Sequence, residues 1–138
     1  MYLGLGCVRY LVALYDELAE AMGLRLICID RWGLGRSESV PKDKRGFSQW
    51  AQMVEAVADQ LGIGVFSILA HSAGAPYALA TSLRCPERIR GRIHLLAPWV
   101  NGSLDGQTTG YKLLKYVPDG LLKTAQAAEW VSQYQMGL

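Results

Sequence analysis

The stretch FSILAHSAGAPYALA, residues 66–80, decides the fold. Its apolar first part, 66–70, favours a β-strand, and the alanine-rich part that follows favours a helix. Ser72 stands in the sharp turn between them, and such a turn needs small neighbours because strand and helix pass close together. Ala70 and Gly74 meet that need. We therefore expect an elbow that displays Ser72, the alternative being a serine that merely caps a helix after a buried strand.

A second informative stretch, LRLICIDRWGLGRS at residues 24–37, lies earlier in the chain. An apolar run over 24–29 favours a strand, and it ends in a loop with the pattern Asp-Arg-x-Gly-x-Gly-x-Ser. The loop and the serine elbow, in this order and spacing, resemble the α/β-hydrolase fold superfamily of the AB hydrolase-1 type. The resemblance extends from the glycine loop at 4–6 to an apolar strand at 93–98.

The periodicity of the remaining residues agrees with an α/β fold. Apolar side chains recur at helical spacing over about 8–22 and over 47–61, and Gly23 is placed to end the first helix. Strands alternating with helices predict a mostly parallel sheet flanked by helices, with ligands at the carboxyl ends of the strands. We expect a partial α/β-hydrolase core over 1–100 and the start of a helical cap or lid over 101–138.

The resemblance implies a role for several residues near the elbow. Ser72 would be the nucleophile in the hydrolysis of an ester or thioester, a small-molecule acyl substrate. The backbone N–H groups of Leu5 and Ala73 would hold the oxyanion, although Leu3 stands where the family often has histidine. The reaction requires no cofactor, and the sequence offers no ligand set for a metal.

Other polar residues near these motifs have simpler interpretations. Asp30 is expected to hydrogen-bond within its own loop, and Trp32 to form a wall of the substrate pocket. His71 is a second pocket residue, but it should face away from Ser72 and so is not expected to be its base. His94 lies inside a predicted strand and is expected to be a hydrogen-bonded structural histidine.

The acid and the base of the site are the main difficulty. In the family both follow the serine, but no histidine follows His94 in this chain. Asp105 is a weak candidate for the acid, the alternative being a turn aspartate. The sequence thus predicts an internal fragment of a serine hydrolase, inactive by itself. The alternatives are a non-catalytic binding or interaction protein and one half of a split hydrolase that a complementing chain completes.

The fragment hypothesis also concerns the sheet. In the family, the strand that ends in the oxyanion loop lies between the strands at 24–29 and 65–70. Loss of most of that strand would leave two inner edges with unpaired backbone groups.

Composition excludes several other classes of protein. The 138 residues carry 14 basic and 12 acidic side chains, which gives no electrostatic case for nucleic acid. Three cysteines without CxxC spacing predict reduced thiols. No apolar run approaches the roughly 18 residues of a membrane span, and no signal peptide is recognisable, which favours a cytoplasmic protein.

Overall fold

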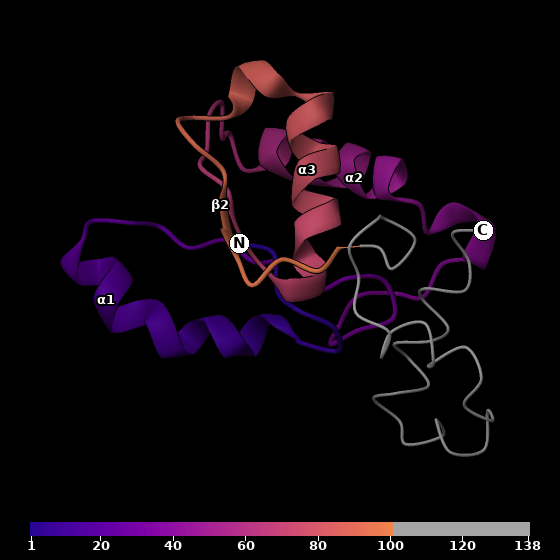
Figure 1. Cartoon of the computed structure of the whole chain (residues 1–138), viewed down its shortest axis with the longest axis horizontal. Helices are drawn as coiled ribbons and strands as arrows, with labels where there is room; N and C mark the ends of the chain where they lie inside the picture. Colours follow the sequence, from indigo (N-terminus) through magenta and orange to yellow (C-terminus); the bar gives the residue numbers. More distant parts are fainter. Residues whose placement is uncertain (101–138) are drawn as a thin grey trace. The chain divides into compact units, whose positions relative to one another are not determined.

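The structure is a computed structural model, and it describes residues 1–100 (Figure 1). By its internal contacts the chain divides into Met1–Trp99 and Val100–Leu138. The predicted cap segment and Asp105 lie outside the described residues.

The structure contains the two helices predicted over about 8–22 and 47–61. The predicted helix over 8–22 is a 3-10 helix that runs directly into an α-helix, and Gly23 follows with a φ of 64°. The elements are η1 (Arg9–Tyr15), α1 (Asp16–Ala21), η2 (Lys42–Lys44), α2 (Phe47–Gln60), η3 (Ser72–Gly74), α3 (Ala75–Arg84) and η4 (Pro86–Arg88). Both predicted helices are thereby confirmed. The first half of the first one, η1, is wound as a 3-10 helix and not as an α-helix.

The sheet is parallel, as predicted, but short. Strand β1 (Leu69–His71) pairs with β2 (His94–Leu96), and Leu69 lies opposite His94. On its other side β1 meets Tyr2, which donates to Leu69 O at 2.8 Å and accepts from His71 N at 2.9 Å. Residues 1–3 therefore occupy the place next to β1 that the family's strand order assigns to them.

The strand predicted over 24–29 is not formed. Within the described residues, one hydrogen bond joins this segment to residues 1–3: the Met1 amino group donates to Ile27 O at 2.6 Å. A strand is defined by a repeated series of hydrogen bonds to its neighbour, and a single hydrogen bond is not enough. The position of the segment agrees with the prediction, whereas its pairing does not.

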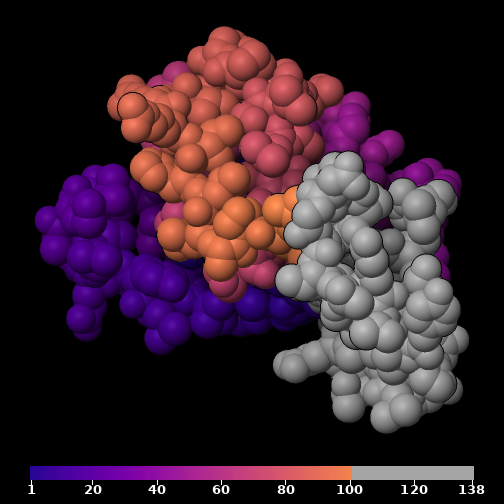
Figure 2. All heavy atoms as spheres, viewed as in Figure 1, coloured from indigo at the N-terminus to yellow at the C-terminus, as the bar shows by residue number. Residues whose placement is uncertain are grey.

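The hydrophobic core lies on one face of the sheet, under α2 and α3. These two helices pack against each other, and in Figure 1 α3 crosses α2. Trp50 of α2, Ile68 and Ala78 of α3 are almost completely buried. Strand β2 is exposed at all three of its residues, in the orange region of Figure 2, and Leu14 of η1 is 77% exposed.

Candidate active site

The elbow at Ser72 has the backbone that the sequence predicts. Ser72 has a φ of 51°, in the left-handed region that costs energy for a residue with a Cβ atom. Strand β1 ends at the preceding residue, and η3 and α3 follow without a break. The serine is therefore held at a sharp strand-to-helix turn, and its side chain is neither fully buried nor fully exposed.

Gly74 is required because residues 1–3 pass directly over it. A Cβ atom at this position would lie 2.6 Å from Tyr2 O and 2.8 Å from Leu3 O, closer than real contacts allow. Both obstacles are main-chain atoms, so neither can rotate away. The requirement for a small residue two positions after Ser72 is thus explained by the neighbouring strand as well as by the elbow itself.

The predicted oxyanion loop lies against the elbow. A Cβ atom added at Gly4 would meet His71 Nδ1 at 3.1 Å and Ser72 Cβ at 3.4 Å. Leu5 follows directly and is half-buried, and Ala73 is buried at the start of η3. The structure therefore brings together the loop and the turn that would supply the two N–H donors.

Arg31 fixes this loop, a connection that the sequence analysis did not find. Its guanidinium donates to Leu3 O at 2.8 Å and to Gly4 O at 2.5 Å, and it lies over the Tyr77 ring at 5.3 Å. A buried guanidinium bound to two carbonyls orients the peptide groups that carry them. The signal in the sequence was the Asp-Arg pair at the start of the second motif, but nothing in that motif indicates a partner 28 residues away.

Asp30 is structural, as expected, although its partners reach further than its own loop. The carboxylate is buried and accepts from the backbone N–H of Arg9 at 2.5 Å, from the Arg9 guanidinium and from Arg36 N at 3.4 Å. Its own carbonyl accepts from Ser37 Oγ at 2.7 Å. Asp30 thereby ties its loop to the start of η1, just after the oxyanion loop.

The two predicted pocket residues lie in different surroundings. Trp32 packs edge-on against Trp50 of α2, with 5.3 Å between the ring centroids. His71 is exposed, and its ring lies next to Gly4. Within residues 1–100 no hydrogen bond joins His71 to Ser72, so the structure offers no support for His71 as the base.

His94 is too far along the sheet to reach the elbow. It is in register with Leu69, three residues before Ser72, and three residues of strand span roughly 10 Å. Its side chain is exposed and makes no hydrogen bond to another described residue, so the expectation of a hydrogen-bonded histidine is wrong. The chain has two histidines, and neither is hydrogen-bonded to Ser72 within residues 1–100.

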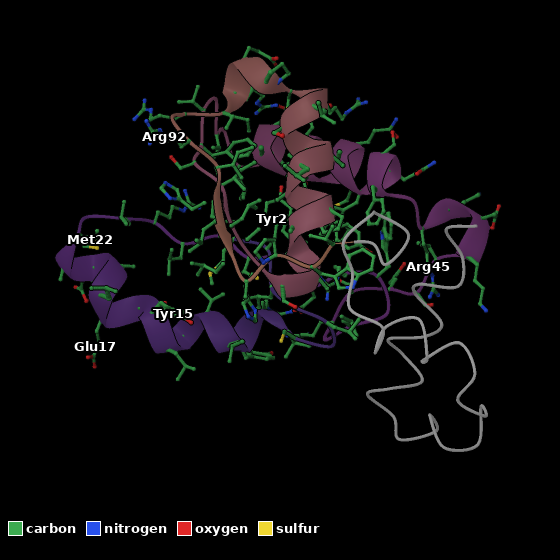
Figure 3. The ribbon with its side chains drawn as sticks, in the orientation of Figure 1. Tyr2, Tyr15, Glu17, Met22, Arg45 and Arg92 are labelled. Carbon is green, nitrogen blue, oxygen red and sulfur yellow. The ribbon has the colours of Figure 1, made fainter. Side chains whose placement is uncertain are left out.

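Burial keeps two titratable groups, Tyr2 and Cys28, in their neutral form. Tyr2 lies beside α3 in Figure 3, where its hydroxyl donates to Thr81 Oγ1 at 2.9 Å. Burial raises the pKa of Tyr2 to about 12 despite that bond, and burial also raises the pKa of the Cys28 thiol. Both groups are therefore protonated at neutral pH.

The described residues also bear on metal binding and on membrane insertion. Among residues 1–100, His, Cys, Asp and Glu form no group of three or more that could hold a metal ion. In the same residues, none of the helices has the length and apolar character needed to cross a membrane. The cysteines Cys7, Cys28 and Cys85 are free thiols, as expected.

Comparison with known proteins agrees with this geometry. A family model described as alpha/beta hydrolase fold matches residues 4–131. A 2-hydroxy-6-oxononadienedioate/2-hydroxy-6-oxononatrienedioate hydrolase of Escherichia coli strain K12 is 34% identical over 87 residues, which are 63% of this chain and 30% of that protein. The protein of the same name from Escherichia coli O139:H28 is 33% identical over the same length. The chain thus spans about 30% of the length of these curated relatives. It belongs to the alpha/beta hydrolase fold family.

Proposed function

We propose that this chain carries the nucleophile half of a serine hydrolase site, with Ser72 as the nucleophile. The observation that carries the proposal is the left-handed φ of 51° at Ser72, with the Gly4 loop packed against the elbow. A strained serine at a strand-to-helix turn is the arrangement that presents a hydroxyl for attack on a carbonyl. Membership of a hydrolase family supports the same conclusion.

The substrate is a carbonyl compound. Sequence reasoning suggests an ester or thioester, and the name of the Escherichia coli relatives adds an unsaturated hydroxy diacid with a 6-oxo group. In either case Ser72 Oγ attacks the carbonyl carbon, and the resulting oxyanion accepts from the N–H groups of Leu5 and Ala73. Collapse of this intermediate leaves the acyl group on Ser72: an ester or thioester loses its C–O or C–S bond and releases the alcohol or thiol, whereas a ketone loses a C–C bond, and the departing group takes up the proton that Ser72 lost. Water then attacks the acyl-enzyme, which releases the acid and restores the serine.

The base that removes the Ser72 proton is not among the contacts of residues 1–100. A serine hydroxyl is a weak nucleophile until a neighbouring base takes its proton. His94 is roughly 10 Å away along the strand, and His71 makes no hydrogen bond to Ser72. We propose that a histidine outside these 138 residues supplies the base, so that residues 1–138 alone have the nucleophile but not the group that activates it.

The experiment is labelling of the purified chain with a fluorophosphonate, with and without added imidazole. Imidazole replaces the missing base in solution, and general-base catalysis is worth about 10²–10⁴ in rate. We expect slow labelling that imidazole accelerates at least tenfold, located at Ser72 by peptide mass mapping. The variant Ser72→Ala should lose the labelling, whereas Ser48→Ala, at an exposed position of α2, should keep the labelling.

A second function is a hydrolase-like protein that binds without catalysis. The observation in its favour is that neither histidine is hydrogen-bonded to Ser72 within the described residues. If imidazole leaves the labelling of Ser72 no faster than that of Ser48, the elbow does not activate its serine. That result would reject the hydrolase proposal and leave the binding function.

A further inference from the structure

A small cavity lies between the first residues of the chain and aromatic side chains of α2 and α3. It has a volume of about 10 Å³, and its lining includes Leu3, Ile29, Arg31, Trp50 and Tyr77. One water molecule needs roughly this volume, so the cavity has room for a single atom of about that size. Arg31 is the one charged side chain among the described residues that line it. A small ligand in this cavity would therefore lie beside a guanidinium.

Two buried N–H donors of the lining have no acceptor. The exposed fractions of Arg31 and Trp50 are 8% and 2%. Neither Arg31 Nε nor Trp50 Nε1 has a hydrogen-bond partner among residues 1–100. The Tyr77 ring is close to both groups, since its centroid lies 5.3 Å from the guanidinium carbon of Arg31 and 5.7 Å from the centroid of the Trp50 ring. Buried donors normally have acceptors, so two unsatisfied donors at one cavity indicate that an acceptor binds there.

The charge of Arg31 indicates which kind of acceptor fits. Its guanidinium donates to the carbonyl oxygens of Leu3 and Gly4, which are neutral groups. Within residues 1–100 no carboxylate forms an ion pair with it, and the adjacent carboxylate of Asp30 is paired with Arg9 instead. A buried cation is normally paired with a negative charge. The surroundings of Arg31 thus favour an anion over a neutral acceptor.

The neighbouring side chains do not supply that negative charge. Burial raises the pKa of Tyr2 to about 12 and also raises the pKa of Tyr77, although Arg31 and Arg45 oppose the shift at Tyr77. Both phenols are therefore protonated at neutral pH. Among the described residues that line the cavity, none is an aspartate or a glutamate. An ion from solution would supply the missing charge.

We propose that this cavity binds a single halide ion, chloride under ordinary conditions, between Arg31 Nε–H and Trp50 Nε1–H. A halide ion accepts hydrogen bonds and donates none, which matches a site with two unsatisfied donors, one of them charged. The volume excludes anions of several heavy atoms, such as acetate or sulfate. The ion neutralises the guanidinium that holds Leu3 O and Gly4 O, and so stabilises the glycine loop at 4–6. This inference does not depend on the proposed activity of Ser72.

Water is the competing occupant, because it has a similar size and also accepts hydrogen bonds. A buried water typically makes about three hydrogen bonds, so it needs acceptors for its own hydrogens as well. Both unsatisfied side-chain atoms of this lining are donors, and water leaves the charge of Arg31 unpaired. The two occupants therefore differ in their effect on stability and in their scattering of X-rays.

The first experiment measures Tm of the full chain while sodium chloride replaces sodium acetate at constant ionic strength. Constant ionic strength keeps the general screening of charges unchanged. An ion that binds the folded chain stabilises it by mass action, so we expect Tm to rise by several degrees as chloride replaces acetate. Equal Tm values in the two salts would overturn the proposal.

A matched pair of variants tests the location. Trp50→Phe keeps an aromatic ring in α2 but removes the unsatisfied Nε1–H, whereas Trp32→Phe makes the same change outside the cavity lining. We expect the affinity for chloride to fall at least tenfold in Trp50→Phe and to be unchanged in Trp32→Phe. Circular dichroism checks that both variants are folded. A full chloride effect in folded Trp50→Phe would place the ion elsewhere and overturn the assignment.

The second experiment needs no variant and identifies the occupant directly. Crystals of the full chain are grown with bromide in place of chloride, and anomalous scattering at the bromine absorption edge locates the ion. We expect an anomalous peak within hydrogen-bond distance of Arg31 Nε and Trp50 Nε1. Electron density there without anomalous signal would identify water and overturn the proposal, and so would bromide found only at other positions.

Discussion

The two ends of the same short sheet differ sharply in how well they are bonded. At the carboxyl end, residues 1–4 are held by β1, by the Arg31 guanidinium and by the close approach of Gly74. At the amino end, 24–27 and 65–67 face a groove with unpaired main-chain groups. The comparison teaches that hydrogen bonds to residues 1–4 are enough to hold the elbow and its loop, although the main-chain groups of Arg25 and Ser67 have no partner among residues 1–100.

The largest effect is expected from Gly74→Ala. The new Cβ atom would collide with Tyr2 O and Leu3 O, which are main-chain atoms, so residues 1–3 must move away from the elbow. Overpacking of this kind costs about 3 kcal/mol in the free energy of unfolding. Gly64→Ala is the control, because a Cβ atom there meets nothing within 4 Å. Equal free energies of unfolding for the two variants, measured by urea denaturation, would contradict the close approach of residues 1–3 to Gly74.

A smaller loss is expected from Asp30→Asn. The substitution keeps the shape of the side chain but removes the charge that holds the Arg9 guanidinium. Hydrogen bonds to charged groups contribute about 2 kcal/mol, and the partial exposure of Arg9 reduces this figure. Asp59→Asn breaks an ion pair to Arg88 near the open end, where the Asp59 side chain is 64% exposed, and should cost less than about 0.5 kcal/mol. Similar losses in the two variants would contradict this account.

Tyr2→Phe should cost about 1 kcal/mol, since it removes the hydrogen bond to Thr81 and leaves that buried hydroxyl without its donor. The expected change is in thermal stability, with the elbow geometry retained. Tyr10→Phe, at a 63% exposed side chain, is the matched control and should be neutral. A neutral Tyr2→Phe would mean that residues 1–3 are not held against α3 in solution.

The smallest effect concerns the Met1 amino group, at the boundary between the two ends. Burial lowers its pKa below the ordinary 8.0, so the unfolded chain binds more protons in the interval below pH 8. Stability should therefore rise with pH up to about 8 and then level off. Acetylation of the amino group removes the dependence and should raise Tm at pH 6 by about 2 °C. Identical pH profiles of Tm with and without acetylation would show that the group is solvated.

How far the sequence predicts this molecule depends on how local each feature is. The elbow at Ser72, the helix of α2 and the loop role of Asp30 follow from adjacent residues, and each is found. The strand over 24–29 depends on a partner elsewhere in the chain, so its apolar pattern alone could not produce a ladder. The Arg31 bonds to Leu3 and Gly4 likewise join distant positions and were not foreseen.

The candidate site shows the same division. Proximity of the Gly4 loop to Ser72 was expected from the resemblance, and the structure has it. The surroundings of His94 were mispredicted because an apolar strand pattern does not reveal that its outer face is uncovered. Asp105 lies outside the described residues and remains a prediction.

The most direct test of the difference between the two ends is amide hydrogen exchange of the native chain, read by NMR. The N–H groups of Tyr2 and His71 donate within the sheet, whereas those of Ser67 and Arg25 have no acceptor among residues 1–100. We expect Tyr2 and His71 to exchange at least about a hundredfold more slowly, near the rate of global unfolding. Equal exchange rates at the four positions would contradict a sheet that is closed at the elbow and open at its other end.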